Sequence, residues 1–177
     1  MVAKQLLGKY ICRRIGKKTL CGKIVETESY PGPYDRASHA FNFKKTPRNE
    51  AEYREGGHIY IYMVYGMYWQ LNISTGAAGY PECVLIRALE PSINRNNKLK
   101  TQNFANGPGK LCRWLGLNKS FYGEDVTKSR RIWLTTGVKI SKSQITNGPR
   151  IGIDYAGPYW ARKRWRFWIK GNKCVSA

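Results

Sequence analysis

Residues 59–73 read IYIYMV, then YGM, then YWQLNI: two runs rich in apolar and aromatic residues on either side of a short break that contains Gly66. β-Branched and aromatic residues favour strands, and two such runs joined by a few residues with a glycine are typical of a β-hairpin. The next apolar run, residues 83–90, predicts a third strand. Arg87 interrupts it, and a buried arginine requires an anionic partner. This part of the chain predicts an antiparallel sheet.

The rest of the chain extends this sheet in both directions. Upstream, the pattern predicts a helical turn over residues 3–8, strands over 10–14 and 19–28, and a polar loop region over 31–57 with one helical turn near 50–54. Downstream, it predicts loop or marginal helix over 91–106, a short helix over 110–116, and strands over 131–135, 150–154 and 166–170. No repeat, low-complexity tract or linker divides the chain. The sequence therefore predicts a single α+β domain over residues 1–177 in which antiparallel strands dominate.

The charge of the chain is strongly positive and unevenly distributed. There are 31 Lys and Arg against 11 Asp and Glu, a formal charge of +20. Residues 1–90 hold 13 basic and 8 acidic side chains, whereas residues 91–177 hold 18 basic and 3 acidic ones. Such a field attracts polyanions, so nucleic acid is the first partner to consider. No apolar run of about 20 residues and no signal-peptide pattern is present, so we expect neither a membrane span nor secretion.

Cysteine and histidine spacing argues against metals and disulfides. The five cysteines are scattered, without a Cys-x-x-Cys pair, which argues against a disulfide framework and a zinc site and favours a reducing compartment. The two histidines, His39 and His58, show no ligand spacing with each other or with the cysteines. The Gly-rich turn at 107–110 lacks the spacing of an ATP-binding loop. We therefore expect no metal and no cofactor, although Lys110 beside a helix start offers a clamp for phosphate.

Two features of the first half suggest chemistry on nucleic acid. Glu26 and Glu28 lie two apart on a strand, hence on one face, where they can activate water; an exposed acidic strand end is the alternative. Tyr60 and Tyr62 form a row on the hairpin that can stand free for stacking, and burial in a sheet core is the alternative. Tyr65, beside Gly66 at the hairpin tip, has the shape of a wedge between base pairs.

The chain resembles the alkyladenine (3-methyladenine) DNA glycosylase family over nearly its whole length. The matching segments lie in collinear order: QLLG at 5–8, IVETESY at 24–30, TPRN at 46–49, YMVYGMY at 62–68, NIS at 72–74, VLIRALEP at 84–91, GPGKLC at 107–112, NKSF at 118–121, RIGI at 150–153 and WARK at 160–163.

The resemblance implies a monomeric single domain with a curved, open-barrel-like antiparallel sheet, short flanking helices and a protruding hairpin. It implies that Glu28 activates water with help from Arg87 and a main-chain carbonyl near Ile151. The flipped base is expected between Tyr62 on one side and Tyr30 with His39 on the other. Asn72 is expected to disfavour guanine and Tyr65 to wedge into the minor groove. Arg48, Lys110 and Lys119 are the expected DNA contacts.

The implied activity is that of a monofunctional glycosylase. It would excise 3-methyladenine and 7-methylguanine from duplex DNA, together with hypoxanthine and etheno-adenine, in the cytoplasm or nucleoid of a prokaryote or the nucleus of a eukaryote. A non-catalytic basic RNA-binding protein is the alternative, and a helix-hairpin-helix glycosylase with a lysine nucleophile is a second one.

Overall fold

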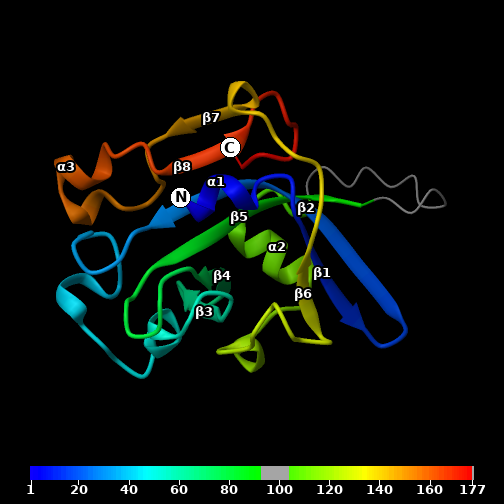
Figure 1. Cartoon of the computed structure of the whole chain (residues 1–177), viewed down its shortest axis with the longest axis horizontal. Coiled ribbons are helices and arrows are strands. Elements are labelled where there is room, and N and C mark those ends of the chain that lie inside the picture. Colours follow the sequence, from blue (N-terminus) through cyan, green and yellow to red (C-terminus); the bar gives the residue numbers. More distant parts are fainter. Residues whose placement is uncertain (93–103, 177) are drawn as a thin grey trace.

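The computed structural model describes residues 1–92 and 104–176, and the stretch over 91–106, expected to be loop or marginal helix, falls mostly outside these ranges. The described part is a curled antiparallel sheet that forms a half-barrel with a few short helices around it (Figure 1). The predicted single-domain α+β architecture with a curved sheet is thereby confirmed. None of the helices in the described ranges combines the length and apolar character that a membrane span requires.

The hairpin and the N-terminal strands form where the sequence predicts them. The helices are α1 (Val2–Leu6), α2 (Pro108–Trp114) and α3 (Pro158–Ala161), and the single turns of 3-10 helix are Phe41–Phe43, Glu50–Tyr53, Lys119–Phe121, Lys142–Gln144 and Asp154–Ala156. The strands are β1 (Tyr10–Ile15), β2 (Lys18–Tyr30), β3 (Ile59–Val64), β4 (Tyr68–Ser74), β5 (Cys83–Pro91), β6 (Ile132–Thr135), β7 (Ile145–Gly148) and β8 (Arg166–Ile169).

The long strand β2 is the centre of the sheet. The main strand order is β3-β4-β5-β2-β1-β6, and β8 adds to β2 beyond the end of β1, with β7 outside β8. Between β2 and β5 the register shifts on both sides of Glu26, at the level of Val25 and Arg87. Such bulges bend a strand and re-aim its side chains. Here they bring acidic residues of β2 and the arginine of β5 to the same place.

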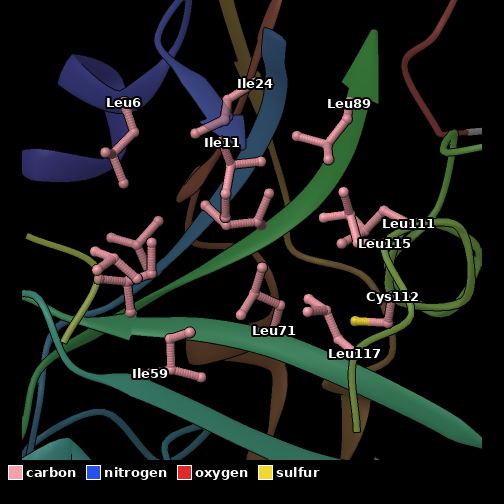
Figure 2. Packing of buried hydrophobic residues seen from close by; sticks show 14 of the residues in the cluster. Leu6, Ile11, Ile24, Ile59, Leu71, Leu89, Leu111, Cys112, Leu115 and Leu117 are labelled. Atoms are coloured by element: carbon pink, nitrogen blue, oxygen red, sulfur yellow. The ribbon is translucent and has the colours of Figure 1, made fainter. Parts of the chain in front are cut away.

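The main hydrophobic core lies between the curled sheet and the helices α1 and α2. Figure 2 shows Leu6 of α1, Ile11 and Ile24 of the N-terminal strands, Leu111 of α2 and Leu115 just after α2 converging on it. All five side chains are buried. This packing fixes β2 and β5, which carry the candidate site, at the wall of the core.

Two predictions about the chain are wrong. The expected strand over 150–154 is a turn followed by 3-10 helix, because Gly152 adopts a φ of +74°, a conformation that strands do not use. The absence of disulfides is also contradicted, since Cys12 and Cys21 are joined by a disulfide. The two residues are direct cross-strand partners in the β1–β2 ladder, with Cα atoms 4.1 Å apart. Spacing along the chain does not reveal pairing across strands. The argument for a reducing compartment loses this support.

Candidate active site

Glu28 lies in β2, fully buried, where β2 is paired with both β5 and β8. Its Oε1 accepts hydrogen bonds from the Arg87 guanidinium at 3.2 Å and from the main-chain N–H of Ile151 at 2.9 Å. Its Oε2 accepts one from the Tyr30 hydroxyl at 2.9 Å. Glu28, Arg87 and Ile151 thus lie together, and Ile151 contacts Glu28 through its N–H. The expected contact between a main-chain carbonyl near Ile151 and the water stays a prediction.

Glu26 holds Arg87 in position from the other side. Its Oε1 lies 3.3 Å from Arg87 Nε and 3.0 Å from Arg166 Nη1, and its Oε2 accepts the main-chain N–H of Ser176 at 2.7 Å. The prediction that Arg87 requires an anionic partner is confirmed, with two carboxylates. The alternative of an exposed acidic strand end is wrong, because neither Glu26 nor Glu28 has any exposed surface. Strand β8 and the residues that follow it cover them.

The protonation equilibrium of Glu28 is set mainly by burial. Burial raises the pKa of this carboxyl above its ordinary value, against the opposing effects of the Arg87 charge and the hydrogen bonds from Ile151 and Tyr30. The same burial, and the neighbouring Glu28 carboxylate, raise the pKa of Tyr30 well above its ordinary value. A carboxylate with a raised pKa is a stronger base, which suits proton abstraction from water.

A cavity of about 820 Å³ opens in front of this cluster. Tyr30, Arg87 and Ile151 border it, so the partners of Glu28 form part of its wall while the carboxylate lies behind them. Ligand sites have volumes of roughly 300–1,000 Å³ and are lined mainly by apolar and aromatic groups. The predicted base-pocket residues Tyr30, His39, Tyr62 and Asn72 all border this one cavity.

The aromatic walls are fixed by contacts between the loop region and strand β3. The His39 and Tyr62 rings meet edge to face with centroids 4.7 Å apart, and His39 Nδ1 lies 2.6 Å from the Tyr60 hydroxyl. Desolvation and the charge of Arg48 lower the pKa of His39 from its usual range, so its ring is neutral at pH 7. The expected free row of Tyr60 and Tyr62 is half wrong. Both residues border the cavity, but Tyr60 is buried and only Tyr62 is half-buried.

Arg150, which the sequence did not single out, supports the opposite wall. Its guanidinium lies 4.6 Å from the centroid of the Tyr30 ring and donates to both oxygens of Asp35, with Nη2 to Oδ1 at 2.9 Å. Both residues of this ion pair are buried. The pair ties the turn at residues 149–152 to the loop after β2, which places Tyr30 and Ile151 against Glu28. The only sequence signal for Arg150 is that the segment RIGI at 150–153 matches the family.

Tyr65 stands at the hairpin tip with 88% of its surface exposed. It has a φ of +51°, and Gly66 after it has a φ of +67°, as a type I′ turn requires at both central residues. A non-glycine residue in this region costs about 1–2 kcal/mol. Neither packing nor backbone preference therefore explains a tyrosine here, and the expected wedge role of Tyr65 stays a prediction.

The basic residues expected at the DNA divide into two groups. Arg48 and Lys110 border the cavity, and the Arg48 guanidinium lies 5.3 Å from the centroid of the Tyr62 ring. Lys119 is exposed but does not border the cavity. Within the described ranges no three His, Cys, Asp or Glu side chains lie together as metal ligands would. The expected absence of metals and cofactors stays a prediction.

Comparison with known proteins agrees with this geometry. A family model described as Methylpurine-DNA glycosylase matches residues 1–173. The chain belongs to the methylpurine-DNA glycosylase family. A protein of Clostridium perfringens (strain 13 / Type A) is 44% identical over 191 residues, covering 99% of this chain and 92% of its own length. The human protein named DNA-3-methyladenine glycosylase is 38% identical over 192 residues, covering 99% of this chain and 63% of its own length. The resemblance inferred from the sequence is confirmed.

Family membership makes this chain a DNA glycosylase of DNA repair. Its cavity also contains residues that sequence reasoning missed. Glu52, from the 3-10 turn Glu50–Tyr53, and Tyr155, whose hydroxyl donates to the carbonyl of Ala37 at 3.0 Å, both border it. Glu52 lies in the helical turn that was expected within a polar loop region, and only the fold shows that this turn directs its carboxyl inward.

Proposed function

We propose that this chain is a monofunctional, monomeric glycosylase that flips alkylated purines such as 3-methyladenine and 7-methylguanine out of duplex DNA and hydrolyses the N-glycosidic bond. The observation that carries the proposal is the buried Glu28, held by Arg87, Ile151 and Tyr30 at the wall of an aromatic cavity. The name of the human relative supports the choice of 3-methyladenine.

Base flipping follows from the position of Glu28. A base inside the stack cannot reach a carboxylate behind a cavity wall, so it must be extruded, at a cost of a few kcal/mol. Tyr65, exposed at the hairpin tip, would fill the space that the nucleotide leaves. Alkylated purines carry positive charge, and the faces of Tyr30 and Tyr62 attract cationic rings. The cavity therefore favours bases that already leave easily.

In the chemical step, the bond between C1′ and the purine nitrogen breaks and its electron pair goes to the base. Positive charge develops on the sugar, and a water oxygen forms the new bond to C1′. Glu28 would stabilise that charge and take the proton from water, as a general base does. Arg87, fixed by Glu26, would keep Glu28 oriented and help to hold the water. No lysine is required as a nucleophile.

Asn72 supports discrimination between purines. Its Nδ2 donates to the main-chain carbonyls of Tyr60 at 3.2 Å and Gln70 at 3.3 Å, and its side chain is buried. Both amide hydrogens are thus committed to the hairpin. A fixed amide in the cavity wall would crowd the exocyclic amine of guanine, which fits the expected disfavour of normal guanine.

The test is to incubate the protein with alkylated duplex DNA and to measure free purines and alkali-labile abasic sites under single-turnover conditions. Release of 3-methyladenine is expected, with no release from undamaged duplex. Binding without product would support the RNA-binding alternative and refute the proposal. A covalent adduct trapped by borohydride would refute the monofunctional mechanism, and Lys110 on the cavity rim would then be the first lysine to test.

A further inference from the structure

Glu52 is a second buried carboxyl in the same cavity, with no role in the mechanism above. Only 2% of the surface of Glu52 is exposed. Glu52 borders the cavity together with Tyr60 and Tyr62 of β3. Its Oε2 has no hydrogen-bond partner among the described residues. A buried polar atom without a partner costs stability, which makes it a candidate for contact with a ligand.

The surroundings of Glu52 differ from those of Glu28. Glu28 has a guanidinium and a main-chain N–H, whereas no Lys or Arg in the described ranges forms an ion pair with Glu52. Burial alone raises the pKa of Glu52 to about 8, so this carboxyl carries a proton at pH 7. Two carboxyls of one site in unequal environments separate into an acid and a base.

The other ionisable groups around Glu52 leave this state unchanged at neutral pH. The phenols of Tyr60 and Tyr62 and the thiol of Cys83 have pKa values raised by burial and stay neutral, and the ring of His39 is neutral as well. The groups close enough for the Glu52 charge to raise their pKa values are Tyr53, Tyr60, Tyr62, Cys83 and Tyr122. His39 and the cation Arg48 line the same cavity, but burial is the only cause of the shift in the pKa of Glu52.

We propose that Glu52 is the proton donor that allows this pocket to release neutral damaged purines as well as cationic ones. The inference rests on the proposed function. A cationic alkylated purine leaves as a neutral molecule when its glycosidic bond breaks. A neutral purine such as hypoxanthine would leave as an anion, which is a poor leaving group, unless a ring nitrogen is protonated.

The step balances without a further reactant. The glycosidic bond breaks and its electron pair goes to the purine, which takes the proton of the Glu52 carboxyl at a ring nitrogen and leaves neutral. Water adds its oxygen to C1′, and Glu28 takes the water proton. Glu52 ends ionised and Glu28 ends protonated, and exchange with solvent after product release restores both.

The experiment compares two variants of Glu52 with a matched control on duplexes that contain one 7-methylguanine or one hypoxanthine. Glu52→Gln keeps the shape and removes the acidic proton, and Glu52→Met removes the polar group with similar volume. The control is Glu50→Gln, on the exposed side of the same 3-10 turn. Single-turnover excision of hypoxanthine should fall about 100-fold or more in both Glu52 variants. Excision of 7-methylguanine should stay within threefold of wild type, as should both substrates with the control.

The pH profile separates a proton donor from a merely structural residue. In the wild type, hypoxanthine excision should decline above about pH 8, the pKa of Glu52, and this decline should be absent for 7-methylguanine. An equal loss of both substrates in the Glu52 variants, or a loss of neither, would overturn the inference and leave the proposed function standing. Failure of the wild type to release 7-methylguanine would instead overturn the proposed function.

Stability gives a readout independent of activity. A folded-state pKa raised to about 8 means that the wild type loses stability as pH rises from the unfolded value, roughly 4.3, towards 8. The difference in melting temperature between Glu52→Met and the wild type should therefore shift in favour of the variant as pH rises from 5 to 8. Above pH 8 this difference should stay constant. A difference that stays constant from pH 5 to 9 would show that Glu52 is ionised throughout and refute its role as an acid.

Discussion

Replacing Glu28 with glutamine changes one atom of the buried cluster and removes its charge. The glutamine Oε1 can still accept from Arg87 and from the N–H of Ile151, as the carboxylate oxygen does at 3.2 and 2.9 Å. The new NH₂ group can donate to the Tyr30 hydroxyl, which rotates to accept. Arg87 keeps Glu26 as an anionic partner at 3.3 Å. The geometry of the site should therefore survive the substitution.

The effects on rate and stability should have opposite signs. Loss of a general base costs about 10²- to 10⁴-fold in rate, or roughly 3–5 kcal/mol of transition-state stabilisation. Because burial raises the pKa of Glu28, the folded protein binds that proton more tightly than the unfolded chain does. The resulting stability is present below the unfolded pKa and lost as pH rises through the folded one. At pH 7.5 the Glu28→Gln variant should thus be at least as stable as the wild type.

Three measurements on one preparation test this reasoning. Single-turnover release of 3-methyladenine should fall by at least 100-fold, equilibrium binding to the lesion duplex should be kept, and the melting temperature at pH 7.5 should not fall. Glu55→Gln is the control, because this exposed residue contacts Ser74 through its main-chain carbonyl. A variant that excises within threefold of the wild-type rate would refute Glu28 as the base, and a lower melting temperature would refute the argument from burial.

Three further predictions concern the hairpin, the buried ion pair and the disulfide. Tyr65→Gly should lower excision strongly. The free energy of unfolding, measured in urea, should stay constant or rise by up to ~1 kcal/mol, because glycine adopts the φ of +51° at this position without the steric cost of a side chain. A large loss of stability would contradict this. Arg150→Met should cost about 3–5 kcal/mol in the same assay by leaving Asp35 buried and unpaired, and adding Asp35→Asn should recover part of it; a cost below 1 kcal/mol would show that the pair is dispensable. Reducing agent should lower wild-type stability by about 2–3 kcal/mol through opening of the Cys12–Cys21 loop, whereas the Cys12→Ser/Cys21→Ser double variant should not respond; an equal response of both proteins would exclude this disulfide as the cause.

Local pattern predicted the parts of the fold that depend on neighbours in sequence. The hairpin at residues 59–73, the strands around Cys12 and Cys21, and the need of Arg87 for an acid were all readable, because alternation and turn chemistry act over a few residues. The burial of Glu26 and Glu28 could not be predicted from local pattern. It depends on β8, which pairs with β2 from about 140 residues further along the chain.

The resemblance named residues that the structure gathers around one cavity, but it missed other residues of that cavity. The resemblance supplied Tyr30, His39 and Tyr62, and all of them border one cavity. It gave no sign of Glu52, because the loop over 31–57 carries no periodicity that shows which side chains turn inward. The strand expected over 150–154 failed for a different reason. Its alternation is real, but Gly152 has a positive φ and the N–H of Ile151 donates to Glu28 rather than to a strand partner.

The contacts of Glu26 have a consequence for how the protein is made. Its partners Arg166 and Ser176 lie 140 and 150 residues further along the chain. At a synthesis rate of about 5–20 residues per second, they leave the ribosome roughly 7 to 30 s after Glu26. Until then Arg87 is held by carboxylates whose covering strand does not yet exist. The cluster of Glu26, Arg87 and Glu28 is therefore completed only after residues 166–176 have been synthesised.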